Sequence, residues 1–258
     1  MKAHFGHLKA GDVTVEVCRA WVAKRRADKK HDGTIWTELG HLRTVLKWAA
    51  DTRRIEHAPK VERPQKPAPK TRHLTRAECR RLIDCAVAPH IRLAIVLMLS
   101  TAARVGAILD LTWDRVDFKR GVIDLRLKSS ATRKGRAVVP MNDGVRSELA
   151  RAKKASVMEL HVIEYKSGPV QSIKTGFNAA VKAAGLSDVT PHVCRHTAAV
   201  HMAEAGIPMD EIAQYLGHDD SRITSRVYAR FSPKHLRGAS NVLDYVSQPR
   251  QDGEDDAG

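Results

Sequence analysis

Apolar residues recur at three- and four-residue spacing in two segments near the N-terminus. The first segment runs from Thr14 to about Asp28, and the second runs from Thr34 to Ala50. Between them, the turn-forming residues His31-Asp32-Gly33 interrupt the pattern. In the second segment, one face collects Ile35, Leu39, Leu42, Val45, Leu46 and Ala49. An apolar stripe with this period predicts two amphipathic helices joined by a short turn.

A proline-rich stretch separates these helices from the rest of the chain. It lies between Ala58 and Arg72 and also contains several lysines and arginines; its prolines are Pro59, Pro64, Pro67 and Pro69. Proline lacks the backbone donor that a helix needs, so we expect an extended basic linker over residues 58–73. The linker predicts a small helical domain over residues 1–57 and a larger domain over 74–247.

The larger segment begins with helices and then becomes β-prone. Thr75 stands three residues before Glu78, which is the spacing of a capping box at a helix start. An apolar helix is expected over about Ile91 to Leu99. Two β-prone runs follow, Gly121 to Leu127 and Arg136 to Met141, separated by a polar segment. This pattern predicts a hairpin.

Helices return after Asn142. Thr190-Pro191 is a strong helix start, since it combines a capping hydroxyl with proline at the first helical position. That helix should end at Gly206, and the next should run from Pro208 to Gly217. The expected fold class is therefore mainly α with a small antiparallel β-sheet. The acidic tail over residues 248–258 is expected to be disordered.

The charge of the chain points to its partner. The 258 residues carry a formal net charge of +15. Such an excess favours a polyanion, because each cation that neutralises a phosphate releases counterions. Five cations near the end of the first predicted helix are expected to contact DNA phosphates: Lys24, Arg25, Arg26, Lys29 and Lys30. A solvated helix face is the alternative interpretation of this group.

Several classes of protein and of site are disfavoured. The four cysteines are scattered and form neither a disulfide framework nor a zinc motif. Met1 to Val13 holds no apolar stretch of the kind found in signal peptides, and the apolar run Ile91 to Ala103 is too short to span a bilayer. We expect a soluble cytoplasmic protein. His192 and His196 are spaced like a metal pair, but no third ligand is signalled, so His196 is expected to be structural.

Candidate chemistry gathers between Thr190 and Ser232. His192 and Arg195 are three residues apart on a predicted helix, so their side chains share a face. The tripeptide Leu216-Gly217-His218 ends the next helix, and Tyr228 follows ten residues after His218. An earlier box reads Thr101-Ala102-Ala103-Arg104 and is followed by Leu111-Thr112-Trp113.

These boxes, in this order and separation, resemble the signature of the tyrosine recombinase (phage integrase) family. Members of that family carry T-G-x-R followed by L-x-W, then H-x-x-R, L-G-H and a nucleophilic tyrosine. The resemblance extends from about Leu74 to Ser232. It implies a site-specific DNA recombinase that integrates or excises a phage or another mobile element.

The resemblance also implies an assembly. A helical core-binding domain and a catalytic domain would clamp double-stranded DNA, the former being shorter here than is usual in the family. Four copies would form a homotetramer on two recombination sites, with an accessory DNA-bending or directionality factor as a further partner. Such a protein would be associated with the nucleoid. The apolar residues between Pro233 and Val246 are expected to dock onto a neighbouring copy.

The chemistry explains why these residue types occur together. A phosphodiester under attack gains negative charge on its non-bridging oxygens, which the guanidiniums of Arg104 and Arg195 can hold with paired hydrogen bonds. The resemblance implies that Tyr228 attacks the phosphorus and forms a 3′-phosphotyrosine. His192 would accept the phenol proton, and His218 would hydrogen-bond a phosphate oxygen. Because the phosphotyrosine conserves the bond energy, rejoining needs no ATP, metal or cofactor.

Two positions depart from the family's pattern. The family takes the proton for the leaving 5′-hydroxyl from a hairpin lysine, about eight residues before a closing V-P. That position is Thr132 here, with Lys128 and Lys134 on either side of it. Lys134 is preferred and Lys128 is its rival. Ala107 stands where the family commonly has a structural glutamate.

Two other functions fit the same pattern. A regulator or prophage remnant that binds DNA without catalysis would retain the fold and lose the chemistry. A Xer-like resolvase of chromosome or plasmid dimers would retain the chemistry in a different biological role.

Overall fold

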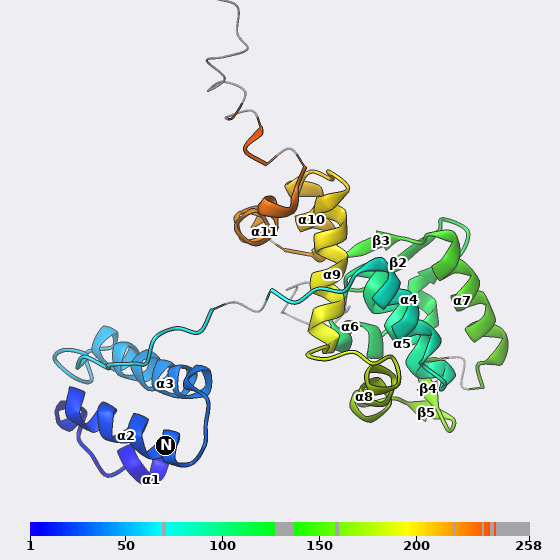
Figure 1. Cartoon of the computed structure of the whole chain (residues 1–258). Coiled ribbons are helices and arrows are strands. Elements are labelled where there is room, and N and C mark those ends of the chain that lie inside the picture. Colours follow the sequence, from blue (N-terminus) through cyan, green and yellow to red (C-terminus); the bar gives the residue numbers. More distant parts are fainter. Residues whose placement is uncertain are drawn as a thin grey trace, which may run out of the picture. The chain divides into compact units, whose positions relative to one another are not determined.

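The computed structural model describes residues 1–68, 71–126, 137–157, 160–218, 220–233, 235–237 and 240. The chain divides into two compact units, Met1–Thr71 and Arg72–Gly258. Both are rich in helix, and the second also holds two small antiparallel sheets. The expectation of a mainly helical fold with a small antiparallel sheet is confirmed (Figure 1). No helix in the described ranges is both long enough and apolar enough to cross a membrane.

The first unit is a helical cluster with its own core. Its elements are α1 (Lys2–Phe5), the 3-10 helix η1 (Ala10–Asp12), α2 (Val15–Ala27) and α3 (Asp32–Asp51). The core collects side chains from all parts of this cluster: Phe5, Val13, Cys18, Trp21, Ile35, Leu39 and Leu46. Helix α3 begins at Asp32, two residues earlier than expected. Val45 is 59% exposed, so its placement on the buried face of this helix was wrong.

The segment after α3 returns along the helices of the same unit. Ile55 and Val61 pack against the core. Arg19 Nε donates to Glu62 Oε1 over 3.1 Å. The Arg63 guanidinium lies 4.2 Å from the centroid of the Trp36 ring, at cation–π distance. Residues 58–68 of the proline-rich stretch form neither helix nor strand, and Val61, Glu62 and Arg63 are held against the first unit.

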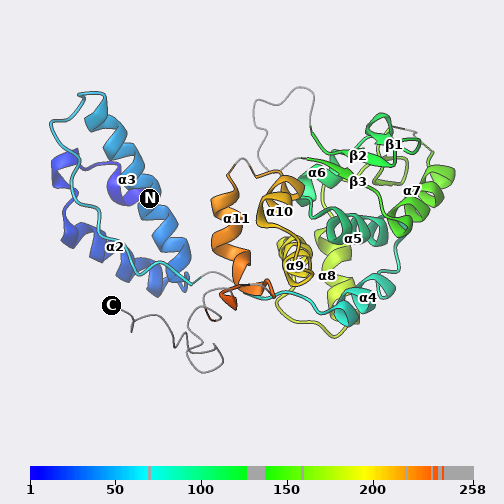
Figure 2. The same ribbon diagram turned by 90° about the horizontal axis from the view of Figure 1, so that it is seen from above.

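The second unit is built around one apolar helix. Its helices are α4 (Arg76–Asp84), α5 (Pro89–Thr101), α6 (Val105–Leu109), η2 (Trp113–Arg115), α7 (Asp143–Ala155), α8 (Lys174–Ala183), α9 (Pro191–Glu204), α10 (Met209–Leu216), α11 (Ser221–Tyr228) and η3 (Ala229–Phe231). Helix α5 contacts α4, α6, α7, α8 and α9, and the views from two sides show it near the middle of this unit (Figures 1 and 2). A helix whose apolar side chains cover most of its surface is stable only when other elements pack around it, which explains this position.

Two small sheets complete the second unit. Strands β1 (Val116–Asp117), β2 (Val122–Asp124) and β3 (Val138–Pro140) are antiparallel in that order, and β4 (Glu164–Tyr165) pairs with β5 (Gly168–Pro169). In the β2–β3 pair, Ile123 lies opposite Val139 and both are fully buried. The expected hairpin is present, although its paired strands are shorter than the β-prone runs. The segment between them, with Lys128 and Lys134, lies outside the described residues, and so does the tail.

Local signals account for several helix boundaries. Thr75 and Glu78 form the predicted capping box, in which each side chain accepts a hydrogen bond from the other residue's backbone N–H. Proline occupies the first turn of α9, as predicted, but the Thr190 hydroxyl makes no capping hydrogen bond. Helix α10 ends at Gly217, whose φ of 65° lies in the left-handed region that glycine adopts without strain.

Candidate active site

Helix α9 carries polar side chains on a buried face. It packs against α5, α10 and α11, and residues Val193 to Val200 are all buried. Among them, Arg195 is 4% exposed and His196 is 8% exposed. Burying an arginine is costly unless its charge is compensated. The partners of these two side chains therefore define the candidate site.

Two helix ends hold the Arg195 guanidinium. Its Nη1 donates to the carbonyl oxygen of Ala102 over 2.7 Å, and its Nη2 donates to that of Leu216 over 2.9 Å. Ala102 caps α5 and Leu216 ends α10, so the cation faces the negative ends of two helix dipoles. Burial, followed by the nearby charge of Arg104, lowers the pKa of Arg195 to about 10. The side chain is still cationic at neutral pH.

The turn after α5 positions two residues of the T-A-A-R box. Ala102 has a φ of 51°, in the left-handed region, and is fully buried. The family's pattern has glycine at this position, and an alanine there costs about 1–2 kcal/mol of backbone strain. The turn aims the carbonyl of Ala102 at Arg195 and places Arg104, exposed, at the start of α6. The turn thus brings the Thr101–Arg104 box, which is distant in sequence, into contact with Arg195 on α9.

His218 completes a chain of hydrogen bonds. Its Nε2 accepts from Arg195 Nη2 over 3.0 Å, because a guanidinium can only donate. The remaining nitrogen, Nδ1, therefore carries the proton and donates to Thr224 Oγ1 over 2.8 Å. Thr224 is fully buried on α11. This chain links α9, the end of α10 and α11.

Tyr228 ends α11 and is buried in the same region. It is 8% exposed and packs with Ala102 and Leu216 in one apolar cluster. Its hydroxyl lies 3.3 Å from His196 Nδ1. Burial raises the pKa of the Tyr228 phenol, while the positive charge of Arg195 lowers it in part. The phenol is thus protonated at neutral pH and lies within electrostatic reach of the buried arginine.

His192 lies on the first turn of α9 and is exposed. Although the residue as a whole is exposed, its ring is partly enclosed, and this partial burial first, followed by the charges of Arg195 and Arg104, lowers the pKa of His192. At neutral pH the imidazole is therefore neutral and able to accept a proton. Arg195 lies within hydrogen-bonding or electrostatic reach of each of the other four sequence-predicted residues, Arg104, His192, His218 and Tyr228. No three His, Cys, Asp or Glu side chains gather into a metal site within the described ranges.

The sequence pattern does not predict the contact of His196 with Tyr228. His196 was expected to be structural, yet its ring nitrogen is the hydrogen-bond partner of the phenol. One sequence feature could have suggested this contact. It is the position of His196 directly after Arg195, on a face of the helix that other elements cover. The partner lies 32 residues further along the chain, so only the packing of α11 on α9 reveals it.

The five basic residues of the first unit fall into two groups. Arg25 donates to Glu38 over 2.5 Å and to Asp28 over 3.0 Å, and Arg26 donates to Asp32 over 2.8 Å. The other three, Lys24, Lys29 and Lys30, are exposed. The two arginines are thus engaged by carboxylates of their own unit.

Comparison with known proteins places this chain in a family. The model of the phage integrase family matches residues 72–235, which is well over half of the chain. The integrase of Salmonella phage P22 is 27% identical over 227 residues, covering 81% of this chain and 57% of that protein. Tyrosine recombinase XerA of Pyrococcus furiosus is 30% identical over 198 residues, covering 73% of this chain and 68% of that protein.

Solved structures show the same fold at lower identity. The Tn1549 transposon integrase in complex with transposon right end DNA aligns with a TM-score of 0.76 at 20% identity, covering 92% of this chain and 87% of that one. A lambda integrase dimer bound to a COC′ core site aligns with a TM-score of 0.66 at 20% identity, covering 82% and 81%. The family match, the XerA relative and the fold agree with one another. This chain therefore belongs to the phage integrase family of tyrosine recombinases.

Proposed function

We propose that this chain is a site-specific recombinase that cuts and rejoins DNA strands through a 3′-phosphotyrosine at Tyr228. The observation that carries the proposal is the buried cation Arg195, hydrogen-bonded to His218 and within electrostatic reach of the Tyr228 phenol. The family membership supports the same chemistry.

The reaction follows from the groups present. The Tyr228 oxygen attacks the phosphorus, an ester forms between that oxygen and the 3′-phosphate of the DNA, and the P–O5′ bond breaks. The guanidiniums of Arg104 and Arg195 hold the non-bridging oxygens as their charge grows. His192 takes the phenol proton, which its lowered pKa allows at neutral pH. The second strand's 5′-hydroxyl then attacks the phosphotyrosine and restores the phenol.

The leaving 5′-hydroxyl must gain a proton, and we propose Lys134 as its donor, with Lys128 as the rival. A substrate with sulfur in place of the 5′-bridging oxygen tests this, because a thiolate leaves without a proton. The sulfur substrate should restore cleavage to Lys134→Ala and leave Lys128→Ala unaffected. If the sulfur substrate restores cleavage to Lys128→Ala instead, Lys128 is the proton donor and Lys134 is not. Rescue of neither variant would remove both from the protonation step.

We also propose that the two units clamp double-stranded DNA and that four copies act on two sites. Both the integrase and the Xer-like roles remain proposals. The P22 integrase and the transposon integrase favour integration or excision of a mobile element. The XerA relative, at 30% identity, favours resolution of DNA dimers as the second candidate. The sequence of the recombination site distinguishes them, since a resolvase site lies within one replicon and an integrase joins two.

The deciding experiment captures covalent protein–DNA adducts in cells that carry the native locus, without a crosslinker. Wild type is compared with Tyr228→Phe and with Tyr215→Phe, a half-buried tyrosine whose hydroxyl donates to the Ser100 carbonyl over 2.8 Å. Adducts should disappear only in Tyr228→Phe, and sequencing the attached DNA identifies the site. A wild type that binds DNA without forming adducts would instead support a regulator without catalysis.

A further inference from the structure

The nucleophile is held by contacts that the reaction itself does not require. Tyr228 is 8% exposed, and its ring centroid lies 5.3 Å from that of His196. The hydroxyl lies 3.3 Å from His196 Nδ1. The phenol oxygen of a tyrosine lies far from the bond about which χ1 rotates, so a small change in χ1 moves the oxygen by several ångströms. Fixing that oxygen therefore matters for an in-line attack.

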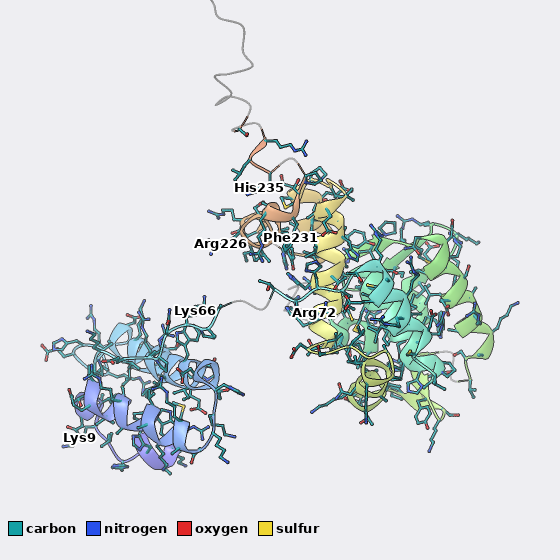
Figure 3. All side chains as sticks on the ribbon, in the orientation of Figure 1. Lys9, Lys66, Arg72, Arg226, Phe231 and His235 are labelled. Atoms are coloured by element: carbon teal, nitrogen blue, oxygen red, sulfur yellow. The ribbon has the colours of Figure 1, made fainter. Side chains whose placement is uncertain are left out.

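His196 is itself packed between aromatic rings. The Phe231 ring, three residues after Tyr228, lies 6.5 Å away edge-on, and Figure 3 shows Phe231 on the turn that follows α11. The ring of His73 lies 6.3 Å from His196 and 5.5 Å from Phe231, again edge-on. These contacts restrict the imidazole to one orientation. His196 is thus rigid where it meets the phenol.

The segment that carries His73 is fixed to the same helix. Leu74 N donates to Thr197 Oγ1 over 2.9 Å, and the Leu74 carbonyl is paired with His201 Nε2 over 2.9 Å. Both partners lie on α9, at positions close to the turn that bears His196. The segment with His73 and Leu74, which packs against His196, is therefore fixed to α9 at two points. Neither of these contacts involves residues of the first unit.

We propose that His196 is a positioning residue for the nucleophile of the proposed recombinase. With its proton on Nδ1, the imidazole donates a hydrogen bond to the Tyr228 oxygen, fixes the direction in which that oxygen points, and leaves the phenol's own proton available to His192. His192 remains the proton acceptor, and His196 exchanges no proton in the reaction. The proposal rests on Tyr228 being the nucleophile and adds a residue that acts through it.

Three substitutions separate positioning from proton transfer. Asparagine can place an N–H donor where Nδ1 stands, glutamine places one nearer Nε2, and alanine provides none. Adduct formation is measured as a single-turnover rate on a nicked duplex of the captured site, with DNA affinity measured separately. His196→Asn should stay within about threefold of wild type, while His196→Ala and His196→Gln should be slower by about tenfold, as expected for one lost hydrogen bond. DNA affinity should not change.

Acetylation by N-acetylimidazole provides a readout without DNA. Tyr165, which is 55% exposed, serves as the internal reference. Tyr228 should be protected in wild type and in His196→Asn, and it should react about tenfold faster in His196→Ala and His196→Gln. His201→Gln, on the same helix, retains a side-chain donor for the Leu74 carbonyl and should leave both readouts unchanged.

Either of two results would overturn the proposal. If His196→Asn forms adducts as slowly as His196→Ala, the histidine transfers a proton and does not merely position the phenol. If His196→Ala matches wild type in adduct rate and in acetylation, the hydrogen bond does not hold Tyr228. A wild type that forms no adduct refutes the recombinase, and the acetylation rates then still test the contact alone.

Discussion

At the scale of single residues, the protonation of His218 is set by its two neighbours. Arg195 can only donate to Nε2, so Nδ1 carries the proton that Thr224 accepts. Thr224→Val keeps the shape of this fully buried side chain but removes the acceptor. We expect the free energy of unfolding to fall by about 1–2 kcal/mol and adduct formation to slow, because a buried N–H loses its partner. Urea denaturation and the single-turnover rate measure the two effects.

The matched control for this change is Thr224→Ser. Serine retains the hydroxyl and loses only a methyl group, so the rate of adduct formation should stay near that of wild type. A Thr224→Val protein with wild-type stability and rate would show that Thr224 does not determine the tautomer of His218.

The sequence predicts the members of the site better than their contacts. The spacing in H-x-x-R places His192 and Arg195 on one helical face whatever surrounds the helix. By contrast, the burial of Arg195 depends on the carbonyls of Ala102 and Leu216, which lie 93 and 21 residues away. The same holds for His196 and Tyr228. No local pattern encodes such pairs, because they form only when α9 packs against its neighbours.

At the scale of elements, two left-handed turns end α5 and α10 beside Arg195. The one at Gly217 has a φ of 65°, which an alanine adopts only at a cost of about 1–2 kcal/mol. Gly217→Ala should therefore lower the free energy of unfolding by about 1 kcal/mol or more, measured by urea denaturation.

The control glycine lies inside a helix. Gly106 is in α6, its φ is not positive, and a Cβ built there meets no other atom within 4 Å. Gly106→Ala should raise the free energy of unfolding by about 0.5–1 kcal/mol. Destabilisation by both substitutions would mean that space, and not the backbone conformation, limits these positions.

Element length decides what the apolar pattern can predict. The helices α3, α5 and α9 are long enough to show their period, and the proline and glycine signals predict where α9 begins and where α10 ends. Strands β1, β4 and β5 have two residues each. A two-residue strand has no period to detect, so these elements depend on tertiary pairing alone.

At the scale of the whole molecule, three histidines tie stability to pH. Burial is the first cause that lowers the pKa of His90, His192 and His201. The unfolded chain binds protons at the ordinary histidine pKa of about 6.5, and the folded chain binds them only at lower pH. The contribution of these histidines to the free energy of unfolding is therefore complete above pH 6.5, and it is lost as the pH falls below that value.

Calorimetry at pH 7.5 and pH 5.5 should show a lower Tm at the lower pH. Carboxylates contribute little to this change, since in the unfolded chain they titrate near pH 4, below the pH range compared, and the folded-state pKa of Glu78, for example, is lower still, at about 2, beside Arg72. In His90→Gln the difference in Tm should shrink, because one of the three groups no longer titrates. A Tm that is equal or higher at pH 5.5 would contradict the expected burial of these rings.

The first unit carries a disproportionate share of the charge. Met1–Thr71 holds sixteen Lys and Arg against eight Asp and Glu, a formal net charge of +8 out of +15 for the chain. The slope of DNA affinity against salt concentration is determined only by those cations that contact phosphate. An arginine held by a carboxylate of its own unit is less available to phosphate, so we expect the exposed lysines to make more of these contacts than Arg25 and Arg26 do.

Replacing Lys24, Lys29 and Lys30 by glutamine should therefore weaken binding to duplex DNA. The slope of log affinity against log salt should become shallower by about 0.9 for each phosphate that the protein no longer neutralises. Replacing Arg25 and Arg26, which bind Glu38 and Asp32, should change the slope less and instead lower the thermal stability of the protein. Affinities measured by titration at several salt concentrations give both slopes. Equal slopes for the two variants would mean that the ion pairs open on DNA, and an unchanged slope for the lysine variant would place the DNA elsewhere on this unit.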